Sequence, residues 1–200
     1  MSSLKKLLVA TNIILVVLEL IAFIHDMYVF SFSAFKWYTI DSNVLQLVVS
    51  LLVVVCYLKK AQIPDFVTKL HFVSAVALTV TFLIAAFVLA PEGGYAYYFI
   101  YDVAPINHLI GPALSVASLL FLEKTDKCSL KIILYPLLAT MAYGIICLIL
   151  NIMRILDGPY FFLKIYDVPA GTIAMWFAII GVLCVVIAFA YYKIKWRSVK

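Results

Sequence analysis

The chain has 200 residues, of which 66% are hydrophobic and only 12% are charged. Soluble domains are nearer half apolar and a quarter charged, so this composition excludes a soluble fold and indicates one integral membrane domain. The formal net charge of +5 does not indicate binding to nucleic acid, because membrane proteins distribute positive charge according to their topology.

A helix needs about 20 apolar residues to cross the hydrocarbon core of a bilayer. Six runs of the sequence reach this length, and they predict an all-α bundle of six transmembrane helices that occupies residues 1–200 as a single domain. The first run has a basic start but no small-residue cleavage site, so we interpret it as a retained anchor. The predicted spans are residues 7–28, 40–58, 69–90, 103–122, 132–152 and 171–192.

Lys and Arg are distributed unevenly over the ends and connections of these spans. The N-terminus, the second and fourth connections and the C-terminus hold 12 of them, whereas the other three connections hold 3. Because cytoplasmic segments are enriched in positive residues, we expect both termini in the cytoplasm. The localisation that we expect is that of a multi-pass protein of the plasma membrane.

The four cysteines do not form a ligand pattern. Cys56, Cys147 and Cys184 fall within apolar runs, and Cys128 falls in a Lys-rich connection. The sequence has no Cys-x-x-Cys motif and no cluster of His and Cys, which argues against disulfides and against a structural zinc site. We therefore expect neither a metal ion nor a cofactor.

Two nearly identical phrases precede the fourth and sixth predicted helices. Residues 100–105 read Ile-Tyr-Asp-Val-Ala-Pro, and residues 165–169 read Ile-Tyr-Asp-Val-Pro. Aspartate is a good N-cap and its charge suits the positive end of a helix, so we expect Asp102 and Asp167 mainly to cap these helices. The alternative is that the two phrases form two walls of one site.

Polar side chains are concentrated in the half of the predicted bundle that faces away from the cytoplasm. Ionisable groups at membrane depth are costly, so this clustering suggests a polar cavity that opens to the outer leaflet. The alternative is that these side chains join helices by hydrogen bonds. Glu19 lies deeper, and we expect it either to be protonated or to pair with an arginine, Arg154. The cluster includes the candidate site residues Asp26, Thr39, Asp41, Ser42, Asn43, Gln46, Asn107, His108 and Arg154, together with His25, Asn151 and Asp157.

A nucleophile and a base are the simplest catalytic parts that this cluster offers. Covalent cleavage of an ester or amide needs a hydroxyl, an adjacent base, and donors that hold the developing oxyanion. Thr39 or Ser42 can supply the hydroxyl, and His108 the base. Asn43 and Asn107 are the candidate donors. A metal hydrolase is disfavoured, because only two of the three histidines lie on the polar side and zinc needs at least three protein ligands.

Three short stretches resemble a known family. Residues 36–39 read Lys-Trp-Tyr-Thr and are followed by Gln46. Residues 106–108 read Ile-Asn-His, and a Tyr-Pro pair at 135–136 leads to a Pro-Tyr pair at 159–160. Together they resemble the androgen-induced / androgen-dependent TFPI-regulating family of multi-span membrane proteins, and the Thr-x-x-Ser-Asn form of this chain resembles the bacterial branch of that family.

The resemblance covers most of the chain and implies a function. Eukaryotic members of the family are threonine hydrolases of fatty acid esters of hydroxy fatty acids. The resemblance therefore implies six helices, a nucleophile at Thr39 and a histidine base at His108. The chain departs from the family pattern at Pro112, where the family has a second histidine, and at Asp41, where eukaryotic members are apolar.

The hypothesis that follows is an intramembrane lipid ester hydrolase whose partners are membrane lipids and a lipid-like substrate. Arg154 is expected to hold a carboxylate of the substrate, because arginine binds carboxylates with two parallel hydrogen bonds. The alternative for Arg154 is an ion pair with Asp157 or Asp26. The alternative for the whole protein is non-catalytic binding or transport of a lipid or small solute in the same cavity.

Overall fold

The computed structural model describes residues 3–197 and confirms the predicted all-α membrane bundle, with no β-strand in that range. Five helical segments are long and apolar enough to cross a membrane, and a further apolar segment is shorter. The elements of the five long segments are, in chain order, α1 (Ser3–Phe30) with η1 (Ser31–Lys36); α2 (Tyr38–Leu58); α3 (Asp65–Ile84) with η2 (Ala85–Leu89) and α4 (Ala90–Gly93); η5 (Leu130–Ile133) with α7 (Leu134–Ile152); and α8 (Ala170–Lys195).

The shorter segment covers residues 106–122 and stands where the fourth span of 103–122 was expected. It is divided into the π-helix η3 (Ile106–Ile110), α6 (Gly111–Ala117) and the π-helix η4 (Ser118–Leu122). Pro112 has no N–H to donate, and a wider π turn precedes it, in which the Gly111 N–H donates to the carbonyl oxygen of Ile106. Among residues 3–197, the count of full-length spanning helices is therefore five instead of the expected six.

The capping prediction for Asp102 and Asp167 is wrong. The residues at the N-cap positions are Pro105 for η3 and Pro169 for α8, and neither helix has a side-chain capping bond. Asp102 lies in a turn with a φ of +50°, a left-handed conformation that aspartate tolerates better than most residues. Asp167 instead lies 4.0 Å from the amine of Lys164. The proline in each phrase fixes the start of the helix, so the aspartate is left outside it.

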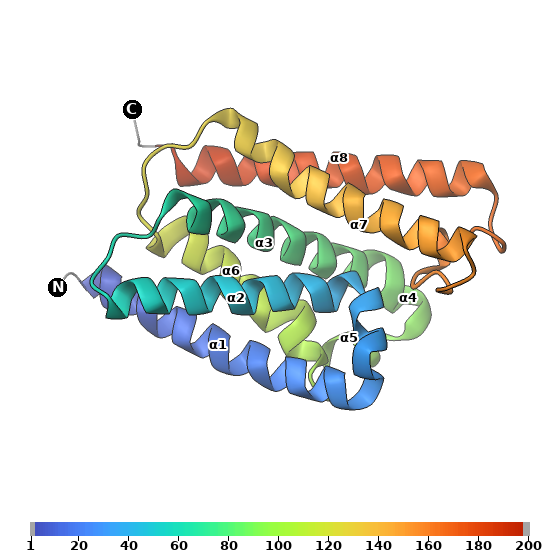
Figure 1. Cartoon of the computed structure of the whole chain (residues 1–200), viewed down its shortest axis with the longest axis horizontal. Helices are drawn as coiled ribbons and strands as arrows, with labels where there is room; N and C mark the ends of the chain where they lie inside the picture. The colour runs from blue at the N-terminus through green and yellow to red at the C-terminus, as the bar shows by residue number, and fades with distance from the viewer. Residues whose placement is uncertain (1–2, 198–200) are drawn as a thin grey trace.

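α3 is the central helix of the bundle. It contacts α2 and α6 on one side and α7 and α8 on the other, and α1 packs against α2 and α6 (Figure 1). α3 is also the most buried of the spanning segments, whereas α8 is the most exposed. The start of α1 and the end of α8 lie at the same end of the molecule, which we call the terminal end. The opposite end, which holds η1 and the short helix α5 (Tyr95–Phe99), is called the site end.

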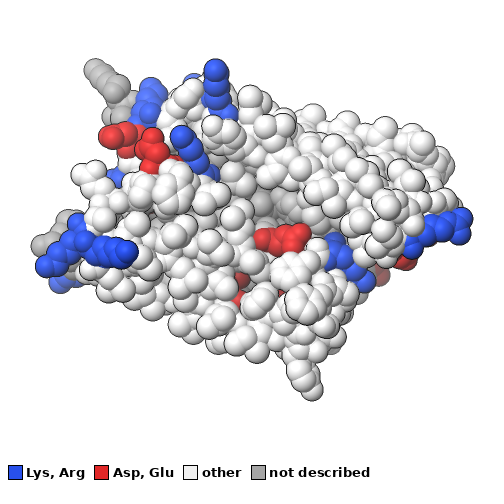
Figure 2. Space-filling model, viewed as in Figure 1, with Lys and Arg blue, Asp and Glu red and all other residues white. Residues whose placement is uncertain are grey.

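The surface between the two ends is suited to lipid. Figure 2 shows most Lys and Arg atoms near the two ends of the molecule, with a broad and largely uncharged surface between them. Large apolar side chains are exposed along this surface, for example Ile24, Leu138 and Val182. A continuous apolar surface of this kind is expected where a bundle faces hydrocarbon instead of water.

Polar side chains inside the bundle join the helices. Gln46 of α2 is fully buried, and its Oε1 accepts hydrogen bonds from Ser74 of α3 at 2.5 Å and from Ser115 of α6 at 2.6 Å. Its Nε2 donates to Ser50 at 2.9 Å. The Asn12 amide of α1 donates to Ser118 of η4 at 2.8 Å. These bonds support the alternative that Gln46 joins helices by hydrogen bonds instead of lining a polar cavity.

A buried charged cluster closes the terminal end. The Glu123 carboxylate lies 2.7 Å from His71 Nδ1 and 3.6 Å from Lys195 Nζ, and all three side chains are almost fully buried. Burial alone would raise the pKa of Glu123, but the charge and hydrogen bond of His71 and the charge of Lys195 hold that pKa below its ordinary value. The Lys195 amine also donates to the carbonyl oxygens of Leu119 and Glu123. The end of α8 is thereby attached to α3 and to the end of η4.

We expect Glu123→Ala to lower the free energy of unfolding by about 3–5 kcal/mol, because it leaves the buried Lys195 charge without its partner. Thermal or denaturant unfolding of the purified protein in detergent measures this effect. Glu92→Ala, which removes an exposed carboxylate, is the matched control and should unfold like the wild type. Equal unfolding of the two variants would show that the cluster does not stabilise the fold.

Candidate active site

Two adjoining cavities lie at the site end. The larger cavity has a volume open to water of about 640 Å³ and mixes polar with aromatic walls, including Asp26, Asp102 and His108. The smaller one has a volume of about 60 Å³ and is almost entirely apolar, with walls from α3, α7 and α8 that include Phe177. Thr39 lines both cavities. We call them the large cavity and the apolar pocket.

Thr39 and His108, the predicted reactive pair, are brought together. Thr39 lies in the first turn of α2 and His108 in the π-helix η3, and their Oγ1 and Nε2 atoms are 3.5 Å apart. His108 Nδ1 lies 3.2 Å from the carbonyl oxygen of Ala104. A carbonyl only accepts, so this contact assigns the proton of the neutral ring to Nδ1 and leaves Nε2 as an acceptor that faces the hydroxyl. The pair therefore has the arrangement of a nucleophile and its general base.

A layer of amides and a carboxylate supports the pair. Asn107 Nδ2 donates to Asp26 Oδ2 at 2.9 Å, which joins η3 to α1. Asn43 Nδ2 donates to the carbonyl oxygens of Thr39 at 2.7 Å and Asn107 at 3.1 Å, which joins α2 to η3. Asn43 Nδ2 therefore uses both of its N–H groups to join helices, which leaves it none for the expected role as an oxyanion donor. Asn107 lines the large cavity and uses one of its two N–H groups for Asp26.

The other predicted site residues lie outside the cavities. Ser42 is buried against α3, where its hydroxyl donates to the Thr39 carbonyl oxygen at 2.9 Å and lies 3.1 Å from the Thr81 hydroxyl. Asp41 is half-buried and lines neither cavity, and Gln46 lies in the interior network. Arg154 is exposed, and its guanidinium lies 4.8 Å from the ring centre of Tyr166. The described geometry does not bring Arg154 to the reactive pair.

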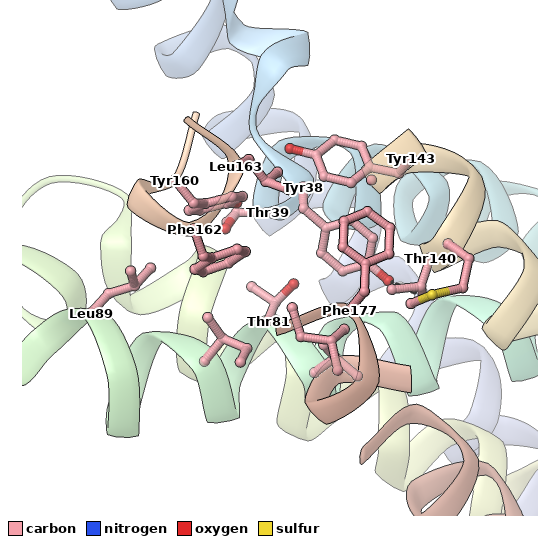
Figure 3. Close-up of a pocket in the computed structure, with 15 residues that line it drawn as sticks. Tyr38, Thr39, Thr81, Leu89, Thr140, Tyr143, Tyr160, Phe162, Leu163 and Phe177 are labelled. Atoms are coloured by element: carbon pink, nitrogen blue, oxygen red, sulfur yellow. Dashed lines mark hydrogen bonds between the residues drawn. The ribbon is translucent and has the colours of Figure 1, made fainter. Parts of the chain in front are cut away.

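Tyr160, which the sequence analysis did not select, is the third polar group beside Thr39. It comes from the connection between α7 and α8 and lines both cavities. Figure 3 shows its ring stacked over Phe162, with Thr39 beside it. Burial raises the pKa of Tyr160 to about 12, although hydrogen bonds with the Thr39 side chain and with the backbone of Thr39 and Tyr38 lower it. The hydroxyl therefore remains a proton donor at neutral pH.

The signal that could have identified Tyr160 was present in the sequence. The Pro-Tyr pair at 159–160 is part of the family resemblance. Tyr160 lies in a connection between helices, where no helical periodicity indicates which side chains face the interior. Its ring packs edge-on against Trp37 at 5.6 Å, directly before α2. This contact holds the connection against the start of α2.

Within residues 3–197, no group of three or more His, Cys, Asp or Glu side chains has the arrangement of a metal site. The residues at the reactive pair instead supply a hydroxyl, an imidazole and a phenol. Searches of family models, curated proteins and solved structures found no match to this chain. Its function is therefore inferred from the chemistry of the site itself.

Proposed function

We propose that this protein is an intramembrane lipid ester hydrolase with Thr39 as nucleophile and His108 as general base. The observation that carries the proposal is the 3.5 Å approach of the Thr39 hydroxyl to Nε2 of His108. The two residues are 69 positions apart in the chain and meet where a large cavity adjoins an apolar pocket. The resemblance to threonine hydrolases of branched fatty acid esters supports the same roles.

The proposed reaction has two steps. In the first, His108 Nε2 takes the Thr39 hydroxyl proton while Oγ1 attacks the ester carbonyl carbon, and the resulting tetrahedral intermediate collapses to an acyl-threonine ester. The leaving alcohol receives the proton from His108. In the second step, His108 removes a proton from water, which attacks the acyl carbonyl carbon. The second tetrahedral intermediate then collapses to release the fatty acid, and Thr39 Oγ1 takes the proton back from His108.

Tyr160 is the proposed oxyanion donor, and the start of α2 supports it. The first N–H groups of a helix have no acceptor within it, and they carry the positive end of the helix dipole. Here the backbone of Tyr38 and Thr39 interacts with the Tyr160 oxygen. Because these N–H groups donate to that oxygen, the phenol proton remains available for a negative oxygen that forms beside Thr39. Fixed donors of this kind lower the barrier of acyl transfer.

The linings of the two cavities favour a substrate with one polar region and one apolar region. The apolar pocket is lined by aliphatic and aromatic side chains, including Ile84, Phe162 and Phe177. A fatty acyl chain fits such walls, whereas the polar part of the substrate would occupy the large cavity. Thr39 lines both spaces, so the ester bond of such a molecule would lie at the nucleophile.

A second candidate function is binding of a lipid without catalysis. The observation that favours it is the distance between Thr39 Oγ1 and His108 Nε2, because 3.5 Å is long for a hydrogen bond between a hydroxyl and an imidazole. Catalytic contacts often tighten only when substrate binds. The hydrolase therefore remains the proposal, and the activity of single variants separates the two candidates.

We also propose that both termini lie in the cytoplasm and that the site opens to the outer leaflet of the plasma membrane. The uneven distribution of Lys and Arg supports this orientation. A lipid substrate would then enter sideways from the outer leaflet.

Thr39→Ala and His108→Ala should each abolish hydrolysis of branched fatty acid esters by the purified protein. The double variant should lose little more than either single variant, because residues that act as one catalytic unit are strongly non-additive. Ser42→Ala is the matched control: it removes a hydroxyl three residues from Thr39 that lines neither cavity, and it should keep the activity. If Thr39→Ala kept the activity and Ser42→Ala lost it, the nucleophile would be Ser42 and the assignment to Thr39 would be wrong. A well-folded wild type without any lipid hydrolysis would support the binding protein instead.

Tyr160→Phe should lower kcat about 10²- to 10³-fold with little change in KM, as expected for the loss of one oxyanion donor. Tyr166→Phe removes an exposed phenol that lines neither cavity and should behave like the wild type. Steady-state kinetics of the three proteins measure the effect. A change in KM alone would instead indicate that Tyr160 only shapes the binding site.

Cysteines introduced at Glu92 and Lys127, in a background without the four native cysteines, should react with impermeant thiol reagents from opposite sides of the membrane. Lys127 belongs to a connection on the proposed cytoplasmic side and Glu92 to one on the outer side, because positive residues mark the cytoplasmic segments. Labelling of intact cells, compared with labelling of opened cells, measures the accessibility of each position. Reaction of both positions from outside would contradict the proposed orientation.

A further inference from the structure

The walls of the large cavity carry a charge pattern that the proposed mechanism does not use. Among residues 3–197, these walls include two aspartates, Asp26 and Asp102, but no Lys or Arg. The basic group beside Asp26 is His25, whose Nδ1 lies 3.4 Å from Asp26 Oδ1. Even with a proton on His25, two carboxylates face one imidazolium, because His108 must be neutral to act as the base. The walls therefore attract cations and repel carboxylates.

Aromatic rings form much of the remaining wall. Seven of the 19 lining residues are Phe, Tyr or Trp, more than twice the 15% share of the whole chain. The rings of Tyr97 and Tyr98 in α5 have centres 5.0 Å apart and planes at 85°, so their faces point in perpendicular directions. The amine of Lys36, which is not a lining residue, already lies 5.0 Å from the ring centre of Trp37. Tyr97 is 61% exposed, so its ring remains open to a cation, which the negative face of an aromatic ring attracts.

The first of the two repeated phrases supplies both kinds of wall. Tyr101 and Asp102 line the large cavity together with the two residues that follow them. No residue of the second phrase, at 165–169, lines either cavity. The two phrases therefore do not form two walls of one site, and only the first has a place in the binding cavity.

These walls favour a quaternary ammonium group over a primary amine. A quaternary ammonium has no N–H group, so it loses no hydrogen bonds when it leaves water, and aromatic walls are the usual way in which proteins recognise it. A primary ammonium needs acceptors for three N–H groups, and both oxygens of Asp26 already lie beside Asn107 and His25. The volume of about 640 Å³ is in the range of cavities that hold small molecules.

We propose that the large cavity binds a quaternary ammonium head group, and that the substrate of the protein is an ester lipid with such a head group. The second part rests on the proposed hydrolase, whereas the binding of the head group does not. With the head group in the large cavity and the acyl chain in the apolar pocket, the ester lies beside Thr39, which lines both. A lipid whose polar region is a free carboxylate is disfavoured at these walls, and Arg154, which was expected to hold a carboxylate, lines neither cavity.

Binding of three single-chain amphiphiles without an ester tests the head group independently of hydrolysis. Isotope-labelled hexadecyltrimethylammonium, hexadecylphosphocholine and hexadecanoate are compared on the wild type in dodecyl maltoside. At least one of the two ammonium compounds should bind saturably at a single site, and hexadecanoate should bind about tenfold more weakly because the acidic walls repel it. Tight binding of hexadecylphosphocholine indicates a choline phospholipid as the source of the head group, and binding of hexadecyltrimethylammonium alone indicates an ester without phosphate. Hexadecanoate that binds as tightly as both ammonium compounds would overturn the proposal.

Two variants with matched controls locate the head group. Asp102→Asn removes the charge and keeps the turn, because asparagine also tolerates a positive φ, and it should weaken ammonium binding about two- to fivefold. Asp167→Asn makes the same change in the second phrase and should bind like the wild type. Tyr97→Leu should also weaken binding about two- to fivefold, whereas Tyr95→Leu, at an exposed tyrosine of α5 that lines neither cavity, should not. Equal binding by each variant and its control would refute this location.

Hydrolysis separates a failure of this proposal from a failure of the proposed function. A branched fatty acid ester with a free carboxylate is compared with a derivative in which an amide joins a trimethylammonium group to that carboxyl. The ammonium form should have a kcat/KM about tenfold higher. Equal or faster hydrolysis of the carboxylate form would overturn the proposed substrate class and leave the hydrolase standing. A protein that binds the ammonium amphiphiles but hydrolyses neither ester would overturn the hydrolase and leave the head-group site standing.

Discussion

The bilayer core contains no water, so each polar group inside the bundle depends on partners from other helices. Gln46 illustrates this constraint, because one amide joins α2 to both α3 and α6 through Ser74 and Ser115. Between two apolar helices in lipid there is little hydrophobic driving force, and packing and such bonds determine which helices associate. The interior network therefore fixes the relative placement of α1, α2, α3 and α6, and the reactive pair lies at the end of this network.

The irregular segment of residues 106–122 is where the fold departs most from an ideal helical bundle. A π turn contains an extra residue, so the side chains beyond it face directions that a regular helix would not give them. Gly111 and Pro112 follow directly, and the close approach of oxygens to Gly111 tolerates no side chain at that position. His108 lies within the same π turn. The irregularity thus sets the direction of the His108 side chain at the reactive pair.

Apolar run length predicted the all-α bundle and the approximate place of each helix, because the thickness of the bilayer sets a minimum length for each span. The fourth helix was predicted too long, since run length does not detect the turn at Asp102 or the break at Gly111. Thr39 and His108 were identified from short motifs, but their contact is a tertiary property. The positions of Tyr160 and Arg154 depend on the course of the connection between α7 and α8. That course follows from packing and not from helical periodicity.

The buried Lys195 cluster has a mechanical consequence for the opposite end of the molecule. α8 is attached to the rest of the bundle at the terminal end by charged and hydrogen-bonded contacts, whereas most of its length faces outward. At the site end, α8 is held by aromatic contacts: Trp176 of α8 stacks on Phe162 with ring centres 4.9 Å apart, and Phe162 stacks on Tyr160 at 5.3 Å. The two ends of α8 are thus attached by different chemistry, charge at the terminal end and stacked rings at the site end. A shift of α8 along its axis would therefore be transmitted through these rings to Tyr160 beside Thr39.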